Sequence, residues 1–398
     1  MWLISENRKK FPLRIVLWGL GIQLFFAAVV LNLPAGVYAL KVVSDAVASF
    51  LNYSLVGAQS AFGNIVNNEM SGTFGFQFAI TVSATIIFFS SFVAMLYHFG
   101  IIQKVVYWMA WLMQKTLHTS GIESLSASAN IFLGQTEAPL LIRHYMPKAG
   151  RSELNSIMVG GFATIAGGVM AAYIQMGMSP AVMITASLLA APGGLMLSKI
   201  VVPPTDDTLS IEEVKDLKVA KQSNFLEAIT AGAGDGLKLA LNVVAMYIAF
   251  VSLMSVIDAS LNQIHLWLVP LGIEYFPNSL GQLFGIIFIP FAYLLSIPAN
   301  EAQAFASLVG TKVGINEFIA YAQLSDMIRA GVLSERTVQL ATFALCGFAN
   351  FSSIAVQIGG IGAMVPEKRA EIAVLGFRAM LIGAMVNLLT TTIASLFI

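Results

Sequence analysis

Seven long apolar stretches place the strongest limit on how this chain can fold. A helix needs ~20 mostly apolar residues to cross the hydrocarbon core of a bilayer. The stretches that meet this demand lie at 11–33, 74–98, 154–176, 180–202, 236–258, 338–363 and 373–396. Only 11% of the 398 residues are charged, whereas a soluble domain carries about 25%. The sequence therefore predicts an all-α polytopic membrane protein whose exterior mostly faces the lipid bilayer.

Lys and Arg in the short loops predict the orientation of these spans, because cytoplasmic loops carry the excess of positive charge. Positive residues flank the first, third, fourth and seventh spans on one side: Arg8, Lys9, Lys10, Arg14, Arg143, Lys148, Arg151, Lys199, Lys215, Lys218, Lys221, Lys368 and Arg369. The loops of the other side hold a single lysine in 34–73 and none in 259–280. We therefore expect a cytoplasmic N-terminus and an external C-terminus. Segment 37–67 is less apolar, and we expect it to be amphipathic and to lie along the membrane interface.

Composition and motifs exclude several classes of function. The net charge is zero and no long basic run is present, which argues against nucleic acid as a partner. The single cysteine, Cys346, cannot form an internal disulfide or a cysteine-based metal cluster. No hydrolase triad, HExxH sequence or nucleotide-binding loop occurs. These absences favour a protein that is not an enzyme.

Two regions, at 122–146 and 299–325, are neither complete spans nor soluble loops, and they resemble each other. Each has a short apolar helix of ~10 residues, a Gly-rich or polar break that ends in Glu, and a second short apolar run. Ten helical residues reach about half-way across a bilayer, so each region is predicted to be a re-entrant hairpin.

Each predicted hairpin has similar neighbours in the sequence. A semi-apolar stretch precedes it, at 101–117 or 281–298, and a span with a polar interruption follows it. The two interruptions are Gly161–Gly167 and Gly347–Ser353. Because the first hairpin starts from the cytoplasmic side and the second from the outside, the pattern indicates an inverted repeat. Transporters with such repeats bind substrate near the midplane, between broken helices.

Polar residues in these segments are candidates for the binding site. Glu137 and Glu317 are predicted near mid-membrane, where a carboxylate is costly unless it meets water, a partner or a ligand. The alternative is that each acid caps the N-terminus of a half-helix. Asn350 carries an amide that needs several partners in hydrocarbon, whereas Ser352 and Thr164 are also compatible with ordinary packing between helices.

Several functions remain compatible with this pattern. An intramembrane hydrolase could use Glu137 and Glu317 as a carboxylate pair, but it would need a nucleophile or metal ligands beside them, and none is convincing. A channel needs a continuous pore, whereas two inverted hairpins suit occlusion and alternating access. A transporter that moves a different small solute by an elevator mechanism, in which one domain carries the solute across the membrane, would keep the same architecture. A transporter is the reading that these residues favour.

The segment Gly134-Gln-Thr-Glu-Ala-Pro139 resembles the GQTEAPL signature of concentrative nucleoside transporters. The resemblance continues, in the same order as in that family, through Leu237–Val243, Asn316–Tyr321 and Cys346–Ser353. It covers nearly the whole chain. It implies a cation-coupled symporter in a bacterial cytoplasmic (inner) membrane that imports nucleosides, with uridine and other pyrimidine nucleosides as the expected substrates. It also implies a homotrimer and an elevator mechanism.

The same resemblance implies a division of the chain. A scaffold would contain residues 1–100 and, after a cytoplasmic linker at 203–235, a span and a long interfacial helix at 236–298. A transport domain would contain two repeats, 101–202 and 299–398. Bacterial members of the family usually have one more span before the stretch that corresponds to Asn7–Lys9. Two alternatives follow: the natural protein is shorter than those relatives, or this sequence lacks their first span.

The resemblance also implies the roles of individual residues. Gln135, Thr136 and Glu137, beside Gly134, would contact the nucleobase, with Phe348 packed against it and Val169 lining the pocket. Glu317, Asn350 and Ser353 would bind the ribose hydroxyls. Sodium, the only cofactor implied, would be held by the side chains of Asn130 and Thr164 and by the backbone carbonyls of Leu133 and Ile165. Thr164 stands where Ser is also found in the family. Because some relatives use protons, proton coupling is the alternative.

Overall fold

The computed structural model describes residues 1–66, 77–204 and 223–398, and every regular element in these ranges is helical. The first half contains α1 (Leu13–Leu31), α2 (Pro34–Phe62), α4 (Phe78–His98), α5 (Ile101–Leu117), α6 (Gly121–Ala129), α7 (Arg151–Ala163), α8 (Gly167–Gln175) and α9 (Pro180–Val201). The second half contains α10 (Phe225–Leu268), α11 (Leu280–Leu294), α12 (Ala299–Gly314), α13 (Glu317–Ala330), α14 (Glu335–Leu345), α15 (Phe351–Met364) and α16 (Arg369–Ser395). Short 3-10 helices are η1 (Trp2–Ile4), η2 (Gly63–Val66), η4 (Ala138–Ile142), η5 (Met146–Lys148), η6 (Val269–Leu271) and η7 (Pro366–Lys368).

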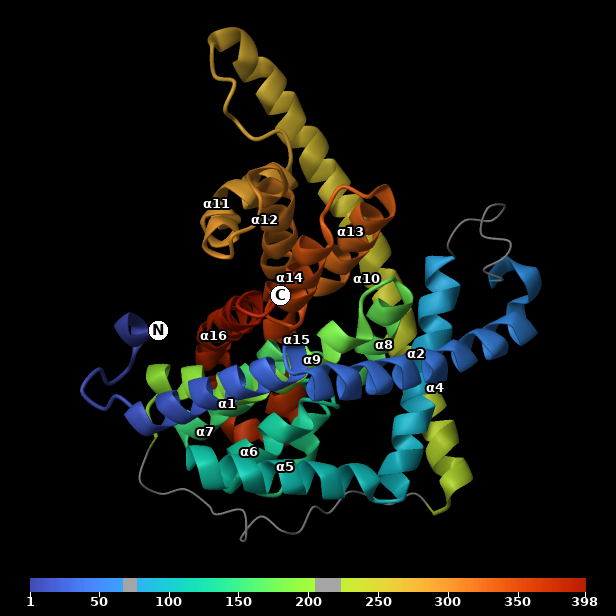
Figure 1. Cartoon of the computed structure of the whole chain (residues 1–398), viewed down its shortest axis with the longest axis vertical. Coiled ribbons are helices and arrows are strands. Elements are labelled where there is room, and N and C mark those ends of the chain that lie inside the picture. Colours follow the sequence, from blue (N-terminus) through green and yellow to red (C-terminus); the bar gives the residue numbers. More distant parts are fainter. Residues whose placement is uncertain (67–76, 205–222) are drawn as a thin grey trace.

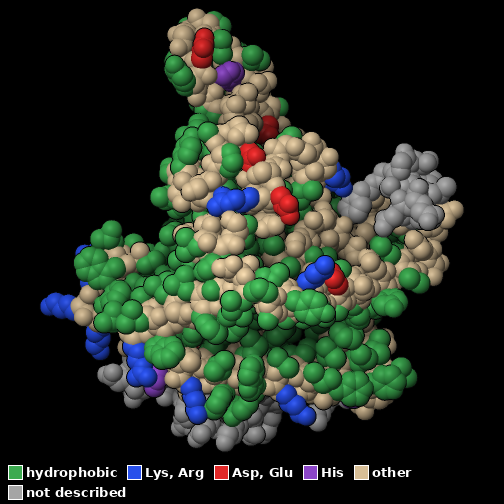
Figure 2. Space-filling view, in the orientation of Figure 1, with side chains coloured by type: hydrophobic (Ala, Val, Ile, Leu, Met, Phe, Trp, Pro, Cys, Tyr) green, Lys and Arg blue, Asp and Glu red, His purple; other side chains and the backbone are tan. Residues whose placement is uncertain are grey.

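The helices fall into an inner and an outer set. Helices α7, α9 and α16 pack against one another, and 83% of the most apolar stretch of α9 is buried. By contrast, only 11% of the corresponding stretch of α10 is buried, although this helix packs along α4 and runs through most of the length of the molecule (Figure 1). Hydrophobic side chains cover much of the visible surface, and Lys and Arg gather along its lower edge (Figure 2). Such an apolar exterior fits a chain that lies in lipid.

The described residues contain seven helices that are long and apolar enough to cross a membrane. Six of them correspond to predicted spans. The seventh, Pro34–Val66, corresponds to segment 37–67, which we expect to lie along the interface. Its length and composition would also allow it to span the membrane, so the interfacial placement stays a prediction. The predicted span 338–363 is divided between α14 and α15.

Helix α10 is longer than the predicted span at 236–258. It begins at Phe225 because the Asn224 side chain caps it, accepting a hydrogen bond of 2.9 Å from the Glu227 N–H. Residues 225–235 of the predicted linker belong to this helix, and its residues 205–222 lie outside the described ranges. Gly232 and Gly236 bring α10 close to α4, where a Cβ at Gly236 would stand 2.8 Å from the Ile87 Cα. This spacing of small residues is typical of close membrane-helix packing.

Both predicted hairpins are present. In the second, α12 and α13 are joined by Ile315 and Asn316 alone, and α12 is bent by 120° from the preceding α11. In the first, α6 is helical, but the returning segment contains only η4 and η5 instead of a second α-helix. The semi-apolar stretches that precede the two hairpins form the helices α5 and α11.

The two predicted interruptions are real helix breaks. Between α7 and α8 the backbone of Thr164 is extended, and the Gly167 N–H donates to the Phe132 carbonyl of the first hairpin at 3.1 Å. A Cβ at Gly167 would lie 2.8 Å from that carbonyl oxygen, so the approach requires glycine. Between α14 and α15 the Phe348 N–H donates to the Thr164 carbonyl at 3.2 Å. The two breaks therefore touch each other, which is the arrangement expected of the repeat.

Candidate functional site

The turn of the second hairpin presents Glu317 to the break between α14 and α15. Its carboxylate is 6% exposed and accepts one hydrogen bond from the Tyr173 hydroxyl at 3.3 Å and another from the Asn350 amide at 2.7 Å. The N-cap of α13 is Asn316, whose side-chain oxygen accepts from the Ile319 N–H at 2.9 Å. Because Asn316 already caps this helix, capping does not account for Glu317.

Asn350 joins this carboxylate to the start of α15. Its Oδ1 caps the helix by accepting hydrogen bonds from the Ser353 N–H at 2.8 Å and from the Ser352 hydroxyl at 2.7 Å. Its Nδ2 is thereby directed at Glu317. The amide orientation is therefore determined by the cap, and the buried side chain presents a donor to the carboxylate.

The first hairpin contributes Gln135 to the same cluster. The Gln135 amide donates to the Ser353 hydroxyl at 3.4 Å, and its Oε1 accepts a hydrogen bond from Gln357 at 3.1 Å. Thr136 packs against Gly360 of α15, where a Cβ would stand 2.6 Å from its methyl group. Five polar residues from both repeats thus form a continuous hydrogen-bonded row, in which the Ser353 backbone N–H makes the link to Asn350: Gln357, Gln135, Ser353, Asn350 and Glu317.

Val169 and Phe348 lie in the apolar wall beside this row. Val169, in α8, is 4% exposed, and Phe348, in the second break, is 8% exposed. Both belong to the hydrophobic cluster that includes Tyr173 and Phe318. Polar groups that can bind hydroxyls are therefore placed next to apolar surface that can pack against a ring.

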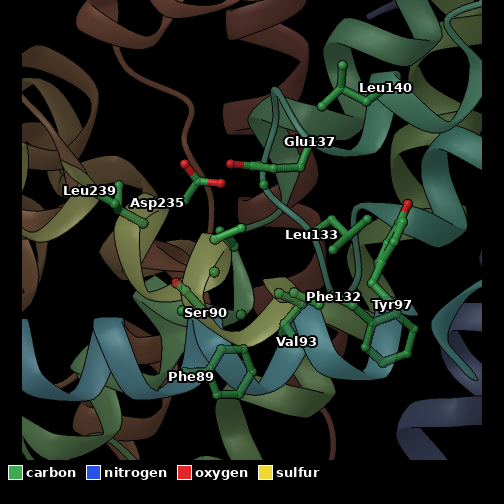
Figure 3. A pocket seen from close by; sticks show the side chains of 18 of the residues that line it. Phe89, Ser90, Val93, Tyr97, Phe132, Leu133, Glu137, Leu140, Asp235 and Leu239 are labelled. Carbon is green, nitrogen blue, oxygen red and sulfur yellow. The ribbon is translucent and has the colours of Figure 1, made fainter. Parts of the chain in front are cut away.

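Glu137 has a different environment from the other predicted residues. It lines a cavity of about 640 Å³ between the first hairpin, α4, α8 and α10, together with Gly134 and Asp235. In Figure 3 the carboxylates of Glu137 and Asp235 point toward each other across this space. The side chain folds over Gly134, where a Cβ would lie 2.1 Å from its Oε2. Glu137 and Glu317 thus have different partners, which disfavours their use as a catalytic carboxylate pair.

The predicted sodium ligands gather at the first helix break. Asn130 is fully buried, and its Nδ2 donates to the Ser126 carbonyl at 3.0 Å while its Oδ1 has no hydrogen-bond donor. Thr164 donates its hydroxyl proton to the Gly160 carbonyl at 2.8 Å, which leaves oxygen lone pairs available. Leu133 and Ile165 are also buried. A buried amide oxygen without a donor is costly unless a cation or another partner binds it, so the residues fit an alkali ion.

Four residues of the site were missed by reasoning from the sequence: Tyr173, Gln357, Lys312 and Asn387. Gln357 could have been found, since it follows Ser353 by four residues and so lies on the same face of α15. Tyr173 gave no signal, because tyrosine is common in membrane helices and its partner Glu317 is distant in the sequence.

Comparison with known proteins shows the family of the chain. Family models match in three parts: "Na+ dependent nucleoside transporter N-terminus" at residues 1–65, "Nucleoside recognition" at 79–180 and "Na+ dependent nucleoside transporter C-terminus" at 182–395. The nucleoside permease NupC of Helicobacter pylori is 39% identical, with 100% of this chain and 94% of that protein aligned. Sodium/nucleoside cotransporter 1 of Mus musculus is 36% identical, with 98% of this chain and 61% of that protein aligned.

Solved structures resemble this chain over its whole length. CNTnw in an inward-facing, substrate-bound state superimposes with a TM-score of 0.93 and 39% identity, with 100% of this chain and 94% of that chain covered. The fold therefore corresponds over the whole length of this chain. The chain belongs to the concentrative nucleoside transporter family.

Proposed function

We propose that the protein is a sodium-coupled symporter that imports uridine and other pyrimidine nucleosides. The observation that carries this proposal is the hydrogen-bonded row from Gln357 to Glu317, because it joins both repeats at their breaks. A carboxylate accepts hydrogen bonds from vicinal hydroxyls, while an amide and a hydroxyl can both donate and accept. Glu317, Asn350 and Ser353 would therefore bind the ribose.

The nucleobase would bind on the side of the first hairpin. Gln135 and Thr136 would contact its polar edge, with Phe348 and Val169 against the ring. Glu137 would reach the base from the neighbouring cavity, beside Gly134. Because Gln135 and Ser353 already share a hydrogen bond, the base and ribose sites would be continuous.

Sodium would bind at the first break, held by Asn130, Thr164 and the carbonyls of Leu133 and Ile165. The unpaired Asn130 oxygen supports this assignment. The Phe348 N–H donates to the Thr164 carbonyl, so an ion that orders Thr164 would also order the segment that carries Phe348. This contact offers a direct physical route for coupling between ion and nucleoside.

Alternating access would follow an elevator movement in a homotrimer. The transport domain would comprise 101–202 and 299–398, and the scaffold would include α1, α2, α4 and α10. The cavity that contains Glu137 lies between these two parts, since α4 and α10 form one wall and the first hairpin and α8 the other. The N-terminus would be cytoplasmic and the C-terminus external, in a bacterial inner membrane.

Uptake of labelled uridine into proteoliposomes tests the proposal. An inward sodium gradient should drive accumulation, an equal potassium gradient should not, and a sodium ionophore should abolish it. Uptake that follows an inward proton gradient and ignores sodium would keep nucleoside transport and overturn the ion site. Folded protein that takes up no nucleoside under either gradient would overturn the proposed substrate.

A further inference from the structure

Lys312 is a buried cation in the last turn of α12. The side chain is 1% exposed, and its ammonium donates to the Ala344 carbonyl at 2.8 Å and to the Asn387 Oδ1 at 2.5 Å. Both acceptors are neutral. In the part of the chain that the structure describes, no salt bridge involves Lys312. A buried ammonium is costly to desolvate, so its presence here needs a specific reason.

Asn387, in α16, completes the arrangement. Its Nδ2 donates to the Ala163 carbonyl and to the Cys346 carbonyl, each at 2.7 Å. The side chain reaches this place because Gly347 has no Cβ, and a Cβ there would lie 2.4 Å from the Asn387 Oδ1. Ala163 ends α7, and Cys346 follows α14. The two side chains therefore satisfy carbonyls at the C-terminal ends of both half-helices.

Helix ends explain why a cation is favourable at this point. The last carbonyls of a helix carry partial negative charge, and here the ends of α7 and α14 converge on one ammonium–amide pair. Each helix break also leaves carbonyls without their usual donors, which is a large cost in the membrane. Lys312 and Asn387 supply those donors from two other helices.

The position of Lys312 links this pair to the ribose site. After Lys312, α12 ends at Gly314, and α13 starts at Glu317 with only Ile315 and Asn316 between them. A shift of Lys312 would therefore displace the Glu317 carboxylate.

We propose that Lys312 and Asn387 form a cationic clamp that holds the two half-helix ends together and thereby positions Glu317 for the ribose hydroxyls. Lys312 is then a positioning residue, since it contacts helix carbonyls and no substrate atom. This inference rests on the proposed function, because its readout is nucleoside binding.

The test compares binding of uridine and of 2′,3′-dideoxyuridine, which lacks the vicinal 2′ and 3′ hydroxyls, to purified full-length protein in detergent. The wild-type chain should bind uridine much more tightly. Lys312→Met keeps the apolar volume and removes the charge, and it should raise the Kd for uridine at least about ten-fold while leaving the Kd for the dideoxy compound within about two-fold. The ratio of the Kd for the dideoxy compound to the Kd for uridine should therefore fall sharply. A clamp that only stabilised the fold would weaken both equally.

Lys199→Met is the matched control. Lys199 is also buried, but it pairs with Glu123 and donates to the Ser152 hydroxyl at 2.7 Å, so its loss should lower thermal stability and leave the nucleoside ratio unchanged. Asn387→Ala tests the other half of the clamp and should reduce the ratio as Lys312→Met does. It also provides the measurement if Lys312→Met does not yield folded protein.

The possible outcomes distinguish a failure of the proposed clamp from a failure of the proposed function. A wild-type ratio in Lys312→Met or Asn387→Ala would overturn the clamp while leaving nucleoside binding intact. The clamp would also be overturned if the same ratio fell in Lys199→Met, because the effect would then follow from the loss of any buried lysine. A wild-type chain that binds neither nucleoside would overturn the proposed function itself.

Discussion

Glu317 and Asn350 share a hydrogen bond of 2.7 Å, and each lies at the N-terminus of a half-helix in the second repeat. Asn350 uses its oxygen to cap α15, so only its NH₂ group can face the carboxylate. Two helix N-termini, both partially positive, therefore converge on one buried acid. This arrangement orients the carboxylate before substrate arrives, which lowers the ordering cost of binding.

Glu317→Gln should reduce uridine uptake by about 10- to 100-fold, which corresponds to the loss of roughly 1.5–3 kcal/mol from a charged hydrogen bond. The substituted amide would also turn an NH₂ group toward either Tyr173 or Asn350, both of which donate hydrogen bonds in the native site. Uptake should be measured at equal membrane abundance, with thermal stability as the folding control. Near-normal uptake would remove Glu317 from the ribose site.

Asn130→Ala should raise the sodium concentration for half-maximal uptake by about ten-fold, equivalent to about 1.4 kcal/mol. The reason is the loss of the buried Oδ1, which has no hydrogen-bond donor of its own. Ser128→Ala is a suitable control, because Ser128 is buried on the same helix and its hydroxyl contacts the Met113 sulfur. An unchanged sodium curve for Asn130→Ala would contradict the ion site.

Gln357→Leu should raise the KM for uridine by about five-fold with a smaller effect on kcat. Gln357 donates to both Gln135 and the Met158 carbonyl, so it holds Gln135 in place for the nucleobase. A five-fold change in KM corresponds to roughly 1 kcal/mol, which is the net contribution of one buried hydrogen bond. Gln23→Leu removes another buried amide, which bonds to Leu189 in α9, and should leave the KM unchanged. Equal KM changes in both variants would show a general packing effect.

Glu6 should make stability depend on pH at the N-terminal segment. A hydrogen bond from Arg151 at 2.8 Å, with a further contact from Arg378, lowers the pKa of Glu6 below its ordinary value of 4.5, against the opposing effect of burial. Because the folded pKa is depressed, this contribution is present above pH 4.5 and is lost as the pH falls through the folded pKa.

The measurement is the difference in Tm between the wild-type chain and Glu6→Gln. We expect a constant deficit for the variant from pH 7 down to pH 5, and a deficit that shrinks below 4.5. Glu335→Gln, outside this cluster, is the control variant. A deficit that is the same at pH 7 and in acid would mean that the ion pairs with Arg151 and Arg378 contribute nothing to stability.

The sequence alone determined the class of the protein and the order of its elements. Apolar stretches, hairpins and breaks depend on local properties, such as the length of a run or a Gly between polar residues, and these are readable residue by residue. For this reason the interruptions at Gly161–Gly167 and Gly347–Ser353 were predicted and are present. Polar residues at the breaks, such as Asn350 and Thr164, stood out for the same reason, and the family resemblance then implied their roles.

Only the tertiary structure decided which of these residues meet. Gln135 and Gln357 are separated by most of the chain, and their contact depends on how the two repeats pack. Glu137 points toward Asp235, which lies on a helix distant in sequence, and its side chain folds over Gly134. Lys312 looked like an ordinary lysine in a hairpin. It became significant because two helix ends, distant in sequence, leave carbonyls that converge on its ammonium and on Asn387.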